Sequence, residues 1–238
     1  MTQLVFVAGA TGYTGREVVA ALTRRGVRTI AHVRPGSAAL TRWRERFNEL
    51  GATVDETPWE PVAMRATLAA HRPSLVFALL GTTRARAARE GLTDAYEKID
   101  YGLSAMLLDA ALHADSLPRF VYLSALGVTE GSKNPYISVR ARLERELVAS
   151  GLSSMIVRPA FVTGPDREEA RTLERVLGVV VDGALAVAGA VGASTLRARW
   201  SSLTGAELAE GMVRIALSAR EARLVIDPAD IRRALRDN

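Results

Sequence analysis

Three polar residues near the middle of the chain could carry out proton transfer beside a carbonyl group. Ser124 lies at the end of an apolar run, and Tyr136 and Arg140 lie at the start of a helix predicted near 137–150. Residues four apart share a helix face, so the tyrosine and the cation would point the same way. The tyrosine would donate a proton as hydride arrives, the serine would hold the carbonyl oxygen, and the cation would ease ionisation of the tyrosine. This arrangement predicts carbonyl reduction or alcohol oxidation.

The element that would hold a cofactor for such chemistry lies at the N-terminus. An apolar run from Leu4 to Ala8 leads into Gly9, Gly12 and Gly15, and a helical pattern follows. The first glycine of such a turn allows a sharp bend, the second lets backbone approach a pyrophosphate, and the third lets the helix pack close to the sheet. The helix N-terminus adds unpaired amides and a partial positive charge. The pattern predicts a bound dinucleotide.

A second loop with the same character follows the strand predicted at 74–80. There Leu80 is followed by Gly81, Thr82 and Thr83. In a doubly wound sheet, ligands bind at the carboxyl ends of the strands. We therefore expect this loop to pass under the middle of the dinucleotide.

The choice between the two nicotinamide cofactors depends on the end of the second predicted strand. An NAD site usually has an acid there for the adenosine ribose, whereas the 2′-phosphate of NADP needs a cation. No acidic residue occurs between Val18 and Arg44, and the strand 28–33 is followed by Arg34. Its guanidinium fork suits a phosphate, and Arg16 in the glycine turn is a second candidate. The sequence predicts NADP(H) in preference to NAD(H).

Apolar runs alternate with helical patterns along the chain, which is typical of a parallel sheet covered on both faces. Strands are predicted at 4–8, 28–33, 52–55, 74–80, 119–124, 153–158 and 223–227. Helices are predicted near 13–25, 38–50, 61–71, 92–115, 137–150, 168–188, 205–218 and 229–236. The predicted fold class is α/β, a Rossmann-type doubly wound parallel sheet. A nucleotide-binding domain would span 1–165, and a small C-terminal substrate-side cap with returning sheet elements would span 166–238.

The amino-acid composition indicates which classes of partner and which cellular location to expect. The net charge is +5, but the arginines are scattered among acids and aromatics make up 5% of the chain, so no nucleic-acid partner is expected. The absence of Cys fits a reducing compartment and no secretory signal is evident, so a cytoplasmic location is predicted. The apolar segment 176–196 contains Asp182 and several glycines, which favours a buried helix pair over a membrane span. The 3 histidines have no ligand spacing, and no metal site is predicted.

Taken together, these motifs resemble the short-chain dehydrogenase/reductase superfamily. GATGYTG after the first strand, LGTTR after the fourth, Ser124, Tyr136 with a base four residues on, and RPA after the sixth strand are similar to its atypical, NmrA-like branch. The stretch LGTTRARAAREGLTDAYEKIDY is similar to the Tat-interacting oxidoreductase-like proteins in particular. The resemblance implies a Rossmann fold and a catalytic Ser124/Tyr136 pair. It also implies that NADP(H) is bound by Gly9, Ala10, Thr11, Gly12, Tyr13, Thr14, Gly15, Arg34, Leu80, Gly81, Thr82, Thr83, Arg140, Pro159, Ala160 and Phe161.

Two departures from the family pattern bear on function. The family motif is YxxxK, and here Arg140 replaces the lysine; it keeps the charge and can bond ribose hydroxyls but is too basic to relay protons. Many relatives also have an acid near the adenine after the third strand, for which Asp55 is the candidate. Three functions stay open: an NADP(H)-dependent oxidoreductase of a small carbonyl or alcohol, a non-catalytic NADP(H)-binding regulator with a protein partner, and a nucleotide-sugar epimerase or dehydratase, for which the tail is short.

Overall fold

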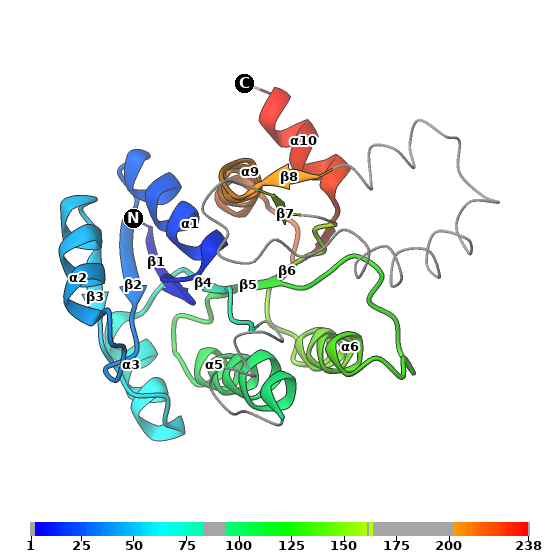
Figure 1. Cartoon of the computed structure of the whole chain (residues 1–238), viewed down its shortest axis with the longest axis horizontal. Helices are drawn as coiled ribbons and strands as arrows, with labels where there is room; N and C mark the ends of the chain where they lie inside the picture. Colours follow the sequence, from blue (N-terminus) through cyan, green and yellow to red (C-terminus); the bar gives the residue numbers. More distant parts are fainter. Residues whose placement is uncertain (1–2, 83–93, 161, 164–201, 238) are drawn as a thin grey trace.

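The computed structural model describes residues 3–82, 94–160, 162–163 and 202–237, and its centre is a seven-stranded sheet (Figure 1). The strands are β1 (Leu4–Ala8), β2 (Arg28–His32), β3 (Thr53–Asp55), β4 (Leu75–Ala78), β5 (Arg119–Leu123), β6 (Ser154–Val157) and β9 (Arg223–Ile226). Every pairing is parallel, in the order β3-β2-β1-β4-β5-β6-β9. A separate two-stranded ladder joins β7 (Val162–Thr163) to β8 (Leu203–Thr204).

Helices cover both faces of this sheet (Figure 1). One face carries α1 (Tyr13–Arg24), α2 (Leu40–Glu49), α9 (Gly205–Ser218) and α10 (Pro228–Arg236). The other carries α3 (Pro61–His71), the π-helix η1 (Tyr96–Leu103) continuing into α5 (Ser104–Leu112), and α6 (Pro135–Ala149). These three layers form a doubly wound α/β fold.

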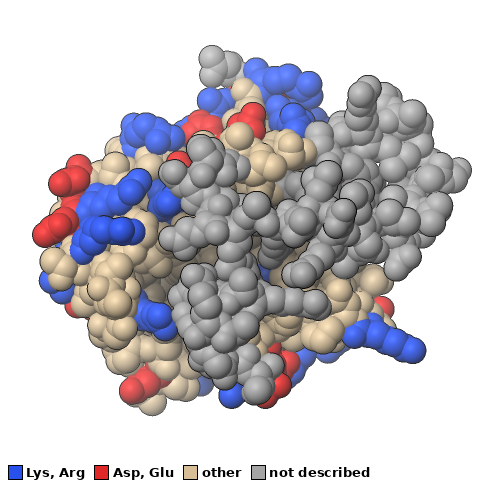
Figure 2. Space-filling model, in the orientation of Figure 1, with Lys and Arg blue, Asp and Glu red and all other residues tan. Residues whose placement is uncertain are grey.

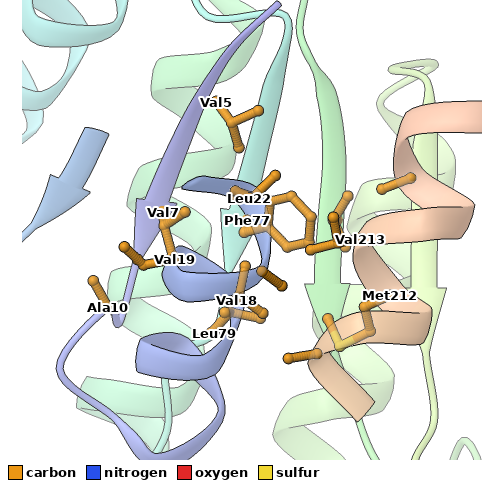
Figure 3. Packing of buried hydrophobic residues seen from close by; sticks show 14 of the residues in the cluster. Val5, Val7, Ala10, Val18, Val19, Leu22, Phe77, Leu79, Met212 and Val213 are labelled. Atoms are coloured by element: carbon orange, nitrogen blue, oxygen red, sulfur yellow. The ribbon is translucent and has the colours of Figure 1, made fainter. Parts of the chain in front are cut away.

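The central strands are buried on both faces, because successive side chains of a strand point to opposite sides. Val5 and Val7 of β1 pack with Phe77 of β4 beneath α1 and α9 (Figure 3). Phe6 and Ala8 point the other way and pack with residues of α3, α5 and α6. A strand covered on both faces needs a continuous apolar run rather than an alternating one, and this is the pattern of β1.

The order of the strands determines where a ligand would bind. From β1 the chain proceeds outward to β2 and β3, and it then crosses to β4 and proceeds outward on the other side to β9. In such sheets, ligands bind outside the carboxyl ends of the strands where the order reverses. Gly9 follows β1, Gly81 lies beyond β4, Ser124 follows β5 and Arg158 follows β6, so the chemistry-bearing residues are at one edge of the sheet.

The predicted fold class is confirmed, and the seven predicted strands are all present, with ends that differ by two residues at most. The helix predicted at 92–115 differs, because its described part begins as a π-helix, which an apolar pattern does not signal. The ladder of β7 and β8 is not foreseen by the sequence pattern. The predicted helix 168–188 and the apolar segment 176–196 lie outside the described residues, and the division at residue 165 stays a prediction.

Charged side chains are distributed over the face shown in Figure 2, where lysines and arginines form separate groups with acids among them. Many charged side chains of the described residues form ion pairs; Arg214 contacts Glu210 at 2.9 Å, for example, and Arg65 contacts Asp109 at 2.6 Å. In the described part of the chain, no helix combines the length and the apolar character needed to cross a membrane.

Candidate functional site

The glycine turn between β1 and α1 is packed so closely that two of its glycines have no room for a side chain. Gly9 has φ of 79°, and a Cβ there would lie 2.5 Å from the carbonyl oxygen of Leu79. A Cβ on Gly15 would overlap the carbonyl oxygen of Gly9, because the first turn of α1 lies directly on the turn. Gly12 has more space, since its Cβ would meet only the Gly9 oxygen at 3.2 Å. The turn therefore has the close backbone geometry of a phosphate-binding loop.

The N-terminus of α1 is left uncapped by side chains of the described residues. Gly12 is the N-cap and its backbone is extended, and the first turn contains no acidic residue. By contrast, α9 and α10 begin with complete capping boxes, formed by Thr204 with Glu207 and by Asp227 with Asp230. The uncapped amides and the helix dipole of α1 suit an anion such as a pyrophosphate.

Tyr13 connects this turn to the C-terminal part of the protein. Its hydroxyl donates to the carbonyl oxygen of Thr163 at 2.9 Å. A Cβ on Gly205 would lie 2.5 Å from the Tyr13 ring, so the first residue of α9 packs directly against this ring. The guanidinium of Arg16 lies 5.1 Å from the centre of the same ring. Among the predicted cofactor residues of the turn, Ala10 is buried, and Thr11 and Thr14 are half-buried.

The loop after β4 forms a hydrogen bond with the carboxylate of Asp100. The backbone amide of Thr82 donates to Oδ2 of Asp100 at 2.9 Å, and Thr82 is buried. A Cβ on Gly81 would lie 3.3 Å from both Arg140 and Asp100, so the glycine leaves room for this ion pair. Leu80 is half-buried, and Thr83 lies outside the described residues.

Arg140 points into the protein from α6. Its Nη2 donates to Oδ1 of Asp100 at 2.7 Å, and its Nη1 donates to the carbonyl oxygen of Leu123 at 2.9 Å. Its Cζ lies 4.4 Å from the centre of the Tyr136 ring. Although burial opposes the charge, Tyr136, Tyr122 and Asp100 raise the pKa of Arg140 above its ordinary value, so this guanidinium is always charged. Its Nε is buried and finds no acceptor among the described residues.

Tyr136 is half-buried at the N-terminus of α6. Its backbone amide is capped by the side chain of Asn134 at 3.0 Å, which fixes the start of the helix. The ring of Tyr96 in η1 meets the Tyr136 ring edge-on, with 5.5 Å between ring centres. As the four-residue spacing predicts, Tyr136 and Arg140 lie on one face of α6. Tyr122 lies behind Arg140, and burial raises the pKa of its hydroxyl to about 12, so it stays protonated.

Ser124 forms a different contact from the one its predicted role requires. Its hydroxyl is buried and donates to the carboxylate of Glu144 on α6. Arg158, which follows β6, binds the same carboxylate, with Nε 3.1 Å from Oε1. Ser124 is therefore part of a hydrogen-bonded cluster with Glu144 and Arg158, whereas Tyr136 contacts Arg140.

The proposed adenosine end of the site lies at the carboxyl end of β2. Arg34 is exposed, and its side chain has no hydrogen bond or ion pair among the described residues. Asp55 is engaged in a turn instead of facing outward, because its carboxylate accepts from the amide and the hydroxyl of Thr57, both at 3.1 Å. His32 is buried behind this turn, with Nε2 2.8 Å from the carbonyl oxygen of Thr57. Arg34 is thus the available cation at this end of the described site.

The segment after β6 continues along the same edge of the sheet. The carbonyl oxygen of Pro159 accepts from the amide of Leu126 at 2.9 Å, which joins this segment to the loop that carries Ser124. Pro159 is buried and Ala160 is half-buried, whereas Phe161 lies outside the described residues.

Asp100, Glu144 and Arg158 are the charged residues of this site that received no predicted role. Glu144 lies four residues beyond Arg140, so helical spacing alone could have placed it on the same face as Tyr136. Asp100 carries no comparable signal, because its partners are 18 and 40 residues away in the chain. The packing of η1 against α6 brings Asp100 next to Arg140.

The sheet, the tight glycine turn and the uncapped helix define a dinucleotide-binding Rossmann protein. More particularly, residues 9–188 match the family model described as NAD(P)H-binding, so the chain belongs to this family. The predicted resemblance to the short-chain dehydrogenase/reductase superfamily is confirmed at the level of an NAD(P)H-binding family. This family match supports a nicotinamide dinucleotide as the cofactor, and the close backbone packing and uncapped helix start of the glycine turn fit its pyrophosphate.

The chain is similar to curated proteins named FMP52, mitochondrial. It is 28% identical to the one from Coccidioides immitis over 224 residues, which is 90% of this chain and 85% of the relative. It is 30% identical to fmp52-1 from Aspergillus terreus over 71% of each chain. A solved structure of UDP-glucose 4-epimerase from Brucella ovis in complex with NAD has a TM-score of 0.64 at 16% identity, covering 96% of this chain and 80% of that one. This likeness supports the fold alone.

These relatives contradict one prediction. A cytoplasmic location was expected from the absence of cysteine and of an evident secretory signal, but the curated relatives are named mitochondrial proteins. The prediction is wrong, because a cysteine-free composition fits any reducing compartment and does not distinguish among them.

Proposed function

We propose that the protein is an NADP(H)-dependent oxidoreductase that interconverts a small carbonyl compound and its alcohol, with Tyr136 as the acid and base. The observation that carries this proposal is the position of Arg140. Its buried guanidinium lies 4.4 Å from the centre of the Tyr136 ring, and it shares Asp100 with the loop that follows β4. A fixed cation beside a tyrosine, next to the switch point of a Rossmann sheet, is suited to proton transfer at a carbonyl.

Each group has a distinct role in this proposal. When bound, the nicotinamide supplies or accepts the hydride. The Tyr136 hydroxyl gives its proton to the carbonyl oxygen during reduction and takes it back during oxidation. Arg140 stabilises the resulting tyrosinate, and because it stays charged it does not relay protons. The serine hydroxyl, Ser124, would hold the substrate oxygen only after exchanging its contact with Glu144.

The preference for NADP(H) belongs to the same proposal and rests on Arg34. This guanidinium is exposed at the carboxyl end of β2, while the nearby carboxylates of Asp55 and Glu56 bind Thr57 and Arg44. A 2′-phosphate at this position would therefore meet a cation, whereas a ribose 2′-hydroxyl would lack an acidic acceptor.

Calorimetric titration tests the cofactor. We expect NADPH and NADP+ to bind more tightly than NADH and NAD+, and Arg34→Ala to remove about tenfold of that preference while leaving NADH affinity unchanged. Arg28→Ala is the matched control, because Arg28 is an exposed arginine at the opposite end of β2. Equal binding of all four nucleotides would remove the case for NADP(H), and failure to bind any would remove the function.

Turnover is tested with NADPH and a panel of small aldehydes and ketones. Tyr136→Phe should lower kcat by about 100-fold or more and leave NADPH affinity within about twofold, since the hydroxyl acts only in the reaction. Tyr96→Phe is the control, because its ring contacts Tyr136 and its hydroxyl has no proposed role. Equal kcat for Tyr136→Phe and the wild type would exclude the proposed acid and base.

One contact favours a second candidate function, a non-catalytic NADP(H)-binding regulator. The Ser124 proton is held by Glu144, so the hydroxyl that would polarise a substrate is occupied. If NADPH binds tightly and no member of the panel turns over, this contact and the YxxxR motif support the regulator. Its protein partner would then be sought with the NADPH-loaded chain.

A further inference from the structure

Asp100 lies between the cofactor loop and the catalytic face of α6. One of its carboxylate oxygens accepts from the Thr82 amide at 2.9 Å, and the other accepts from Arg140 Nη2 at 2.7 Å. The carboxylate side chain has no exposed surface, and that of Arg140 is 6% exposed. A single buried group therefore connects the loop after β4 to the cation beside Tyr136.

The helix that carries Asp100 has an unusual form. Residues Tyr96–Leu103 form a π-helix, which then becomes the regular α-helix α5. π-helical turns are rare, and they occur frequently at functional sites because they redirect side chains from their α-helical positions. In η1 the one buried side chain is that of Asp100.

Stability alone gives little reason to keep this arrangement. Removing two charges from water costs free energy that their attraction only partly returns, and apolar residues of the same volume often serve a fold as well or better. The pair is placed where β4 ends, at the carboxyl edge of the sheet, and the missing Cβ of Gly81 makes room for it. The arrangement suits a site that must hold a cation in one orientation.

We propose that Asp100 is a positioning residue that holds the cofactor loop and Arg140 in register, so that cofactor binding and the alignment of Tyr136 depend on one another. This inference rests on the proposed function. Asp100 does not touch the substrate or the reacting atoms; it acts through the Thr82 amide on the loop and through the Arg140 guanidinium on Tyr136.

The test uses Asp100→Asn in the full chain. An asparagine side chain presents one acceptor oxygen, so it can serve Arg140 or Thr82 but not both. We expect hydrogen exchange at the Thr82 amide, measured without cofactor, to become at least about tenfold faster. The NADPH dissociation constant should rise about tenfold, and kcat should fall more than KM rises. In the Tyr136→Phe background the same substitution should lower kcat no further, because two residues that act through one group are not additive.

Asp109→Asn is the matched control. Asp109 lies on α5, is partly exposed, and pairs with Arg65, so its loss should change none of these values. If Asp100→Asn does not fold, Asp100→Asn/Arg140→Gln, which neutralises both charges, is compared with Arg140→Gln. A folded Asp100→Asn with wild-type NADPH affinity and Thr82 exchange would overturn the role of Asp100 alone. A wild type that binds no nucleotide would overturn the proposed function, and this role with it.

Discussion

The hydroxyl of Ser124 donates to the carboxylate of Glu144, about two helical turns along α6 from Tyr136. Glu144 and Arg140 are four residues apart on the same buried face, and each forms an ion pair with a residue from another part of the chain. Arg158 binds Glu144, and Asp100 binds Arg140. The face of α6 that meets the sheet therefore carries two charged residues, one helical turn apart, that are each paired with an opposite charge. Tyr136 lies on the same face at the N-terminal end of the helix.

Glu144 is predicted to stabilise the fold through this cluster. Glu144→Gln should lower the free energy of unfolding by about 2 kcal/mol, because Arg158 loses the carboxylate that it binds with two nitrogens. Glu130→Gln should change it by less than about 0.5 kcal/mol, since Glu130 is exposed and its nearest cation lies 3.9 Å away. Urea unfolding of the three proteins measures both values. Equal stability of Glu144→Gln and the wild type would show that the cluster contributes nothing to folding.

Two glycines of the turn are expected to serve different purposes: Gly15 is needed for packing, and Gly12 is needed for cofactor binding. Gly15→Ala should lower the free energy of unfolding by about 3 kcal/mol or prevent folding, because its methyl group would overlap the backbone of Gly9. Gly12→Ala should fold with a smaller loss of stability than Gly15→Ala, since its methyl group would meet only the Gly9 oxygen at 3.2 Å and a small shift relieves this contact, and it should weaken NADPH binding by about tenfold or more.

Thermal unfolding and calorimetric titration of both variants check this division. Gly36→Ala is the control, because a Cβ at Gly36 would meet nothing within 4 Å. Gly12→Ala with unchanged NADPH affinity would contradict the assignment of this turn to the phosphates.

The turn could be predicted from the sequence because its determinants are local. Strand, glycine spacing and helix follow one another within the first 24 residues, and Gly9 and Gly15 show the close packing expected of their places in the turn. The shared face of Tyr136 and Arg140 is likewise a consequence of helical spacing. The direction in which Arg140 points is not local, because Asp100 comes from a helix 40 residues earlier. The contact of Ser124 with Glu144 also depends on how α6 packs against β5, which no spacing in the sequence specifies.

Arg140 is predicted to tolerate lysine better than a neutral residue. Arg140→Lys keeps the positive charge but cannot serve Asp100, Leu123 and Tyr122 with the same spread of donors, so the free energy of unfolding should fall by about 1–2 kcal/mol. Turnover should persist within about tenfold. Arg140→Met leaves Asp100 buried without its cation and should cost about 3–5 kcal/mol.

Urea unfolding and kcat measurements distinguish these variants. Where Arg140→Met is too unstable to assay, Arg140→Gln provides the neutral comparison. If the neutral variant turned over as fast as the lysine variant, the charge beside Tyr136 would have no part in the reaction.

His32 is predicted to make stability depend on pH near neutrality. Burial lowers the pKa of its imidazole below the ordinary value of 6.5, and the hydrogen bond to Thr57 and the charge of Asp55 only partly oppose this. The native state therefore keeps His32 neutral as the pH falls below 6.5, whereas the unfolded chain takes up a proton. Since the unfolded state binds more protons, the free energy of unfolding should fall by up to about 1 kcal/mol per pH unit in that window. His32→Gln can still donate to the Thr57 carbonyl and does not titrate, so the difference in slope between the two proteins isolates His32 from His71 and His113. Parallel stability curves from about pH 7.5 to 5.5 would show that His32 is free to protonate in the folded protein.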